Sequence, residues 1–142
     1  MTKEKGTRTN VISLVIPAKA EYIALGRLAV TGLLRTRAVE PEVIADVKLA
    51  LTEACSNSIR HAYADGRQGR VEIRYELADG SLAVEVSDEG GGFDPELLDA
   101  CPGGLDEGGL GIAIIRALTD DLSIGPRSGG TGYCVRFTKN LE

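Results

Sequence analysis

The sequence predicts a single domain that contains both helices and strands, and three observations support this. The chain has 142 residues, a usual length for one domain. Its apolar residues alternate in some segments, as in strands, and follow helical spacing in others. An Asp79-Gly80 pair, a strong hairpin signal, separates the alternating segments 71–77 and 81–87. No repeat, low-complexity tract or linker divides the chain, so one domain is expected over residues 1–142.

The first half of the chain predicts one strand and two helices. Residues 11–16 are rich in branched side chains and predict a strand that ends at Pro17. Residues 21–35 carry apolar side chains at helical spacing and predict a helix with an unusually apolar surface. Pro41 opens a second helix at its first turn. The buried stripe of that helix is expected to contain Val47, Leu51, Ala54 and Ser58.

The second half predicts the hairpin, a loop, one helix and two strands. Residues 94–107 hold prolines, paired glycines and acidic residues, a composition typical of a mobile loop that resembles a lid. A third helix is expected over 111–120, and strands are expected over 122–126 and 132–138. The turn Gly129-Gly130-Thr131 precedes the last strand.

Composition excludes several classes of function. The net charge of −5 and the absence of a Lys/Arg cluster weigh against a nucleic-acid partner. Three cysteines and a single histidine cannot supply a standard zinc spacing, and they suit the reducing cytoplasm. The apolar run VISLVIP is too short for a signal peptide or a membrane span. The protein is therefore expected to be cytoplasmic, with no membrane or nucleic-acid partner.

The segment LTEACSNSIRHAY (51–63) holds the first candidate site residues. Glu53, Asn57 and His61 are four residues apart, so in a helix they lie along one stripe. Asn57 can offer a neutral carbonyl oxygen to Mg²⁺, and Glu53 can orient or deprotonate a hydroxyl that attacks a γ-phosphate. The alternative is that Glu53 and Asn57 are merely solvated helix positions. His61 is more typical of a structural residue than of a ligand.

The segment VSDEGGGFD (86–94) follows the hairpin. Asp88, at the end of a strand, can accept a hydrogen bond from an adenine amino group, while Gly90 and Gly92 let the main chain lie against the base. Thr131 can complete the same pocket. The alternative is an ordinary Asp-Glu-Gly turn.

The segment EGGLGIAII (107–115) opens the third predicted helix. Main-chain N–H groups at a helix N-terminus favour anions, so this segment is a candidate phosphate cradle. Its candidate nucleotide-binding residues are Gly108, Gly109, Leu110 and Gly111. Taken in this order, the three segments suit magnesium and an adenine nucleotide, ATP or ADP.

ExxxNxxxH on a helix, then DEGGGFD, then GGLG resembles the GHKL (Bergerat-fold) ATPases, and nearly the whole chain resembles anti-sigma factor serine kinases of the RsbW and SpoIIAB type. The resemblance implies an α+β fold, a two-layer sandwich with a mixed, mostly antiparallel sheet covered by helices on one face. It implies Asn57 as Mg²⁺ ligand, Glu53 as catalytic base and Asp88 as adenine anchor. Nucleotide contacts are implied for Gly90, Gly92, Gly109, Gly111 and Thr131.

The same resemblance implies partners. In that family the first helix and its surroundings serve dimerisation and partner binding, which gives Arg27 and the apolar helix 21–35 a role. Such a kinase sequesters a sigma factor and phosphorylates a serine or threonine of a STAS-type anti-sigma factor antagonist. A homodimer is expected.

The segment 95–107 departs from the family pattern. It is shorter than the expected ATP lid and contains no Lys, Arg, Ser or Thr to meet a γ-phosphate. This keeps open an alternative function, a nucleotide-responsive partner-binding module with little or no kinase activity. The catalytic domain of a histidine kinase is a third possibility, disfavoured because a free-standing chain of this length has no room for a phospho-acceptor domain.

Overall fold

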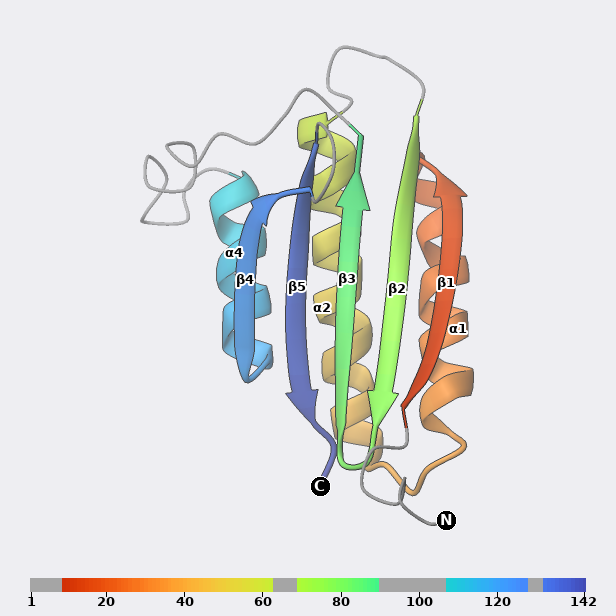
Figure 1. The fold of residues 1–142 in the computed structure, drawn as a ribbon. Helices are drawn as coiled ribbons and strands as arrows, with labels where there is room; N and C mark the ends of the chain where they lie inside the picture. The colour runs from red at the N-terminus through yellow and green to blue at the C-terminus, as the bar shows by residue number, and fades with distance from the viewer. Residues whose placement is uncertain (1–8, 63–68, 90–106, 128–131) are drawn as a thin grey trace.

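The computed structural model describes residues 9–62, 69–89, 107–127 and 132–142 (Figure 1). Five strands form one sheet in the order β1-β2-β3-β5-β4. The described elements, in chain order, are β1 (Asn10–Pro17), the short 3-10 helix η2 (Ala20–Tyr22), α1 (Ile23–Leu34), α2 (Pro41–Ala62), β2 (Arg70–Ala78), β3 (Ser81–Asp88), α4 (Glu107–Leu118), β4 (Asp121–Pro126) and β5 (Tyr133–Asn140).

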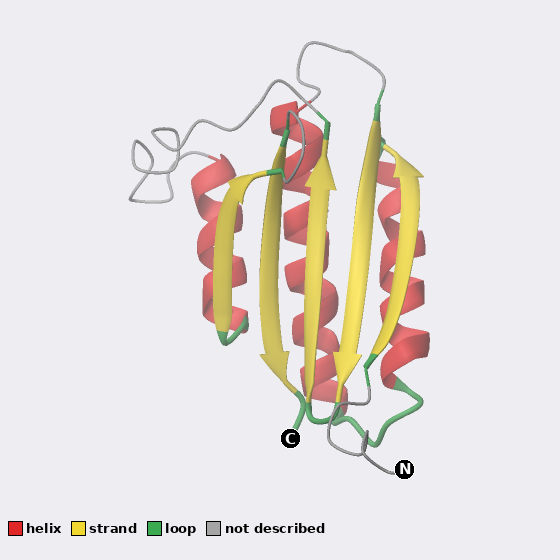
Figure 2. Cartoon of the chain, in the orientation of Figure 1, coloured by secondary structure: helices red, strands yellow, loops and turns green. Residues whose placement is uncertain are grey.

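The helices α1, α2 and α4 all lie on one face of the sheet (Figure 2). The expected α+β two-layer fold is therefore confirmed. All strand pairs are antiparallel: β1 with β2, β2 with β3, β3 with β5, and β4 with β5. Among the described strands the sheet is thus antiparallel throughout, rather than mixed.

The core lies between the sheet and the helices. Alternate residues of β2, among them Ile73 and Tyr75, are fully buried, as Phe137 of β5 is. The predicted buried stripe of α2 is confirmed, because all of its members are completely buried: Val47, Leu51, Ala54 and Ser58. Because this stripe packs on the core, the rotation of α2 about its axis is fixed, and Asn57 is turned toward the start of β5.

The hairpin between β2 and β3 forms as predicted. Ala78 pairs with Ser81, so only Asp79 and Gly80 make the turn. Gly80 has φ +84°, a conformation that favours glycine. The register carries β3 to its end at Asp88, which pairs with Val71.

Two helix boundaries differ from the predictions. The first predicted helix, 21–35, begins as a 3-10 turn before α1. The third, predicted over 111–120, begins at Glu107 and ends at Leu118. Glycines disfavour helix interiors, which led the prediction to place the first glycines of EGGLG outside the helix. The helix forms there because Ile112 and Ile115 are buried in the core and anchor α4.

The predicted strands 11–16, 122–126 and 132–138 are confirmed with small shifts of their ends. The predicted lid, 94–107, lies outside the described residues except for Glu107, and the turn 129–131 lies wholly outside them. No helix among the described residues has the length and apolar character needed to cross a membrane.

Candidate functional site

Asn57 lies on α2 and is buried, with 3% of its surface exposed. Its Nδ2 donates a hydrogen bond to the Tyr133 hydroxyl at 2.9 Å. Its Oδ1 is buried and accepts no hydrogen bond from the residues that the structure describes. A buried polar atom without a partner is costly and rare. A neutral carbonyl oxygen of this kind fits the oxygen ligands that Mg²⁺ prefers.

Asp88 ends β3 and is 1% exposed. Its Oδ1 accepts a hydrogen bond from the main-chain N–H of Tyr133 at 3.3 Å. Buried carboxylates persist where hydrogen bonds or opposite charges compensate for lost solvation. The side chain is thus held at a strand end, where it can accept a hydrogen bond from a purine amino group.

Gly132 lets the main chain pass close to Asp88. It has φ +102°, and a Cβ atom placed on it would collide with the main-chain carbonyl oxygen of Asp88. Only glycine satisfies both conditions without strain. The start of β5 is therefore pressed against the end of β3 at the residue that we expect to bind adenine.

Glu53 lies on α2 one turn before Asn57 and is partly exposed. It approaches Gly111 in α4, where an added Cβ would lie 3.1 Å from Glu53 Oε1. A side chain at residue 111 would crowd this carboxylate. The structure thus brings the candidate base next to the glycine-rich first part of α4.

The other predicted site residues are placed only in part. Gly108, Gly109 and Leu110 belong to the start of α4 by main-chain conformation. His61 lies in the last turn of α2. Three nucleotide-contacting candidates lie outside the described residues: Gly90, Gly92 and Thr131.

Tyr133 was missed by the sequence analysis. It is the first residue of β5, it is 8% exposed, and it contacts both Asn57 and Asp88. Burial raises the pKa of its hydroxyl, and the nearby Asp88 charge raises it further, so the hydroxyl stays protonated at neutral pH. The only signal in the sequence was the alternation of Tyr133, Val135 and Phe137, which marks an inward-facing position but no partner.

Arg27, the predicted partner-binding residue, lies on α1 and is partly buried. Its Nη1 donates a hydrogen bond to Thr52 Oγ1 at 3.3 Å. The guanidinium therefore links α1 to α2 at the residue directly before Glu53.

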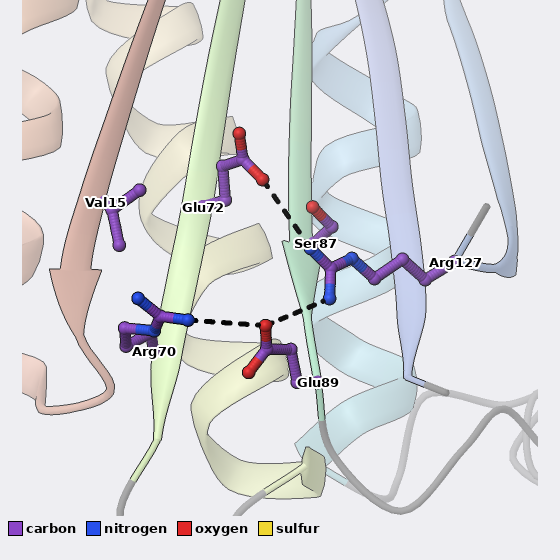
Figure 3. Close-up of a pocket in the computed structure, with 6 residues that line it drawn as sticks. All are labelled: Val15, Arg70, Glu72, Ser87, Glu89 and Arg127. Atoms are coloured by element: carbon purple, nitrogen blue, oxygen red, sulfur yellow. Dashed lines mark ion pairs between the residues drawn. The ribbon is translucent and has the colours of Figure 1, made fainter. Parts of the chain in front are cut away.

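On the face of the sheet away from α1, α2 and α4, an ion-pair network includes Glu89, the residue directly after Asp88 (Figure 3). The guanidinium of Arg127 pairs with Glu89 at 3.3 Å and with Glu72 at 3.7 Å, and Arg70 pairs with Glu89 at 3.6 Å. The main-chain N–H of Arg127 donates to Gly132 O at 3.0 Å. The network borders a hollow of about 120 Å³ and joins the ends of β2, β3 and β4.

Comparison with known proteins identifies the family. Residues 16–139 match the family model described as histidine kinase-like ATPase domain. Curated relatives with the name serine-protein kinase RsbW include one from Bacillus pumilus, 34% identical over 90% of this chain and 86% of the relative. One from Listeria monocytogenes is 35% identical over 83% of this chain and 81% of the relative.

Solved structures share the fold. A crystal structure of the RsbU and RsbW domains of a Mycobacterium tuberculosis protein has a TM-score of 0.68 at 22% identity, over 93% of this chain and 32% of that chain. The catalytic domain of histidine kinase ThkA has a TM-score of 0.59 at 17% identity, over 93% of this chain and 96% of that chain. From the family match and the curated relatives, the chain belongs to the histidine kinase-like ATPase family and, within it, to the RsbW group of ATP-binding serine-protein kinases.

Proposed function

We propose that this kinase is an anti-sigma factor that binds Mg-ATP, sequesters a sigma factor and phosphorylates a STAS-type antagonist protein on serine or threonine. The observation that carries the nucleotide part is the buried Asn57 Oδ1, which has no hydrogen-bond partner among the described residues and lies one helical turn from Glu53. The names of the curated relatives support the kinase part, and the resemblance to anti-sigma factor kinases suggests the partners. Partners of this kind place the protein in the cytoplasm.

Different residues of the site contact different parts of the nucleotide. Asp88 accepts a hydrogen bond from the adenine amino group, and Asn57 supplies a carbonyl oxygen to Mg²⁺. Main-chain N–H groups at the start of α4 face the phosphates. Bound Mg-ATP supplies the phosphoryl group and the cation that neutralises its charge.

Glu53 is the proposed catalytic base. Its carboxylate accepts the proton of the attacking serine or threonine hydroxyl, or orients that hydroxyl toward the γ-phosphate. Gly111 leaves room for the substrate on this side, because it places no side chain against Glu53. Glu53 therefore acts in transfer and contributes little to nucleotide binding.

The test compares Glu53→Gln with the native chain, using Mg-ATP and a STAS-domain antagonist. The variant should bind Mg-ATP within about twofold of the native affinity, while phosphoryl transfer falls roughly 10² to 10⁴-fold. Calorimetry measures binding, and mapping of the phosphorylated residue measures transfer. Absence of transfer by the native chain, with normal ATP binding, would contradict the kinase mechanism.

A nucleotide-responsive binding module is the second candidate, favoured by the composition of segment 95–107, which has no Lys, Arg, Ser or Thr. In that case ATP and ADP would change the affinity for the sigma factor without any transfer. Glu53→Gln would then leave partner release unchanged. Measuring release and phosphorylation in the same reaction separates the two functions.

We further propose that β1 and α1 form the homodimer and partner surface. Ile12 of the edge strand β1 is exposed on the side of the helices, and so are Tyr22 and the α1 leucines Leu25 and Leu28, the last at 71%, while Val11 and Val15 of β1 are exposed on the other face of the same edge. An exposed apolar surface beside a strand at the edge of the described sheet is typical of an interaction site. Leu28→Glu should shift the sedimentation of the native chain toward the monomer, whereas Leu49→Glu on α2 should not. Unchanged sedimentation of Leu28→Glu would contradict this surface.

A further inference from the structure

Tyr133 is the one residue in the described part of the chain that bonds to both Asn57 and Asp88. Its hydroxyl accepts a hydrogen bond from Asn57 Nδ2 at 2.9 Å, and its main-chain N–H donates to Asp88 Oδ1 at 3.3 Å. Asn57 comes from α2 and Asp88 from β3, so β5 connects the helix and the strand. The residue thus joins the two ends of the proposed nucleotide site.

In this structure the hydroxyl of Tyr133 accepts a hydrogen bond from the Asn57 amide nitrogen, and this bond holds the amide in one orientation. An amide carries its donor and its acceptor on opposite sides, so a bond to Nδ2 turns Oδ1 away from the tyrosine. In this orientation Oδ1 has no partner among the described residues. A side chain without a hydroxyl at position 133 would remove the hydrogen bond that holds the amide in this orientation.

We propose that Tyr133 is a positioning residue, which aims the Asn57 carbonyl oxygen at Mg²⁺ while its main chain holds the Asp88 carboxylate for the adenine. This inference rests on the proposed function. It assigns the two contacts to different parts of Tyr133, because the hydroxyl serves the metal end and the main chain serves the base end. Removal of the hydroxyl alone should therefore separate the two effects.

Tyr75 provides a matched control. It is a fully buried tyrosine of β2, and its hydroxyl donates a hydrogen bond to Gly26 O at 2.8 Å, a partner outside the nucleotide site. Tyr75→Phe and Tyr133→Phe thus each remove one hydroxyl group that takes part in a buried hydrogen bond. Only the second should alter the response to magnesium.

The experiment measures ATP affinity by calorimetry over a range of Mg²⁺ concentrations and again with excess chelator. We expect Tyr133→Phe to raise the half-saturating Mg²⁺ concentration about three- to tenfold, the usual effect of one lost hydrogen bond. Its affinity for ATP without Mg²⁺ should stay within about twofold of native, because the N–H bond to Asp88 remains. Tyr75→Phe should keep the native magnesium dependence, even where its unfolding midpoint falls.

A second measurement needs no variant. In the NMR spectrum of the native chain, the Asn57 side-chain amide protons should exchange slowly with solvent, because one of them is hydrogen-bonded to the Tyr133 hydroxyl, and they should shift when Mg-ATP is added. Fast exchange, or an equal magnesium dependence for Tyr133→Phe and the native chain, would overturn the positioning role. Failure of the native chain to bind Mg-ATP would instead overturn the proposed function.

Discussion

Asn57 combines a satisfied donor with a buried carbonyl oxygen that has no partner in the described part of the chain. Leaving such an oxygen unpaired costs about 1–3 kcal/mol, whereas an average hydrogen bond contributes about 1 kcal/mol. The amide therefore contributes little to the stability of the nucleotide-free protein. This cost is the expected signature of a group kept for a ligand.

Asn57→Ala tests that signature. The variant should lose the Mg²⁺-dependent part of ATP affinity, because Oδ1 is removed, while the unfolding free energy of the nucleotide-free protein changes by only about 1 kcal/mol. Calorimetry with and without Mg²⁺, together with urea unfolding, gives both quantities. A large loss of stability with unchanged magnesium dependence would assign Asn57 a structural role.

Asp88→Asn should act at the other end of the nucleotide. Loss of the charged acceptor should weaken ATP and ADP equally, about tenfold to a hundredfold, and this loss should be the same with and without Mg²⁺. Parallel titrations with the two nucleotides measure it. A change confined to Mg-ATP would argue that Asp88 belongs to the phosphate end.

The sequence predicted three of these candidate residues, Asn57, Glu53 and Asp88, but not Tyr133. Asn57 and Glu53 follow from helical spacing, and Asp88 from its place at the end of an alternating strand, which are local patterns. Tyr133 could not be predicted, because its hydrogen bond to Asn57 joins residues 76 positions apart and arises only when α2 packs on the sheet. The sequence shows that position 133 faces inward, but not what lies opposite.

At the scale of elements, the start of β5 determines how the site is built. Gly132 lies against the Asp88 carbonyl, and its own carbonyl oxygen accepts a hydrogen bond from Arg127 at the end of β4. Arg127 in turn pairs with Glu89, directly after β3. The ends of β3 and β4 and the start of β5 are thereby joined next to Asp88, the proposed adenine anchor.

Gly132→Ala should disturb this junction. The left-handed φ and the collision with Asp88 O together should lower the unfolding free energy by about 1–3 kcal/mol and weaken adenine nucleotide binding. Gly125→Ala in β4 is the control, because a Cβ there meets no atom of the described residues within 4 Å. Urea unfolding and ADP calorimetry measure both effects. Equal behaviour of the two variants would show that the close approach at Gly132 is unimportant.

The elements also show where local propensity is insufficient. The strands and α2 match their predicted positions because alternation and the Pro41 start are strong local signals. The start of α4 was predicted four residues late because glycines have poor helix propensity, which burial of Ile112 and Ile115 overrides. The antiparallel pairing of every described strand could not be read from any single segment.

At the scale of the whole molecule, three buried groups, the Cys55 thiol and the hydroxyls of Tyr75 and Tyr133, should make the protein less stable at alkaline pH. Burial raises the pKa of Cys55 from 9.0 to about 12, and it raises the pKa values of Tyr75 and Tyr133 above their usual 10.0. These groups ionise more readily in the unfolded chain. Stability should therefore be complete below about pH 9 and should decrease as the pH rises toward the folded-state values.

Urea unfolding at neutral pH and at about pH 10.5 tests this expectation. Above pH 9 each ionising group should lower the unfolding free energy by up to about 1.4 kcal/mol per pH unit. Cys55→Ala should remove the first part of the decrease, between its unfolded pKa and that of tyrosine. A stability that stays constant over this range would contradict the burial of these groups.

The C-terminus lies at the end of the sheet opposite to Asp88. Leu141 N–H donates to Gly80 O in the hairpin turn, and Ser81 pairs with Asn140, so about 23 Å of strand separates this end from Asp88. A fluorophore or affinity tag attached after Glu142 would therefore lie far from the proposed nucleotide site. Immobilised through that end, the protein could be exposed to cell extract with the proposed nucleotide site pointing away from the support.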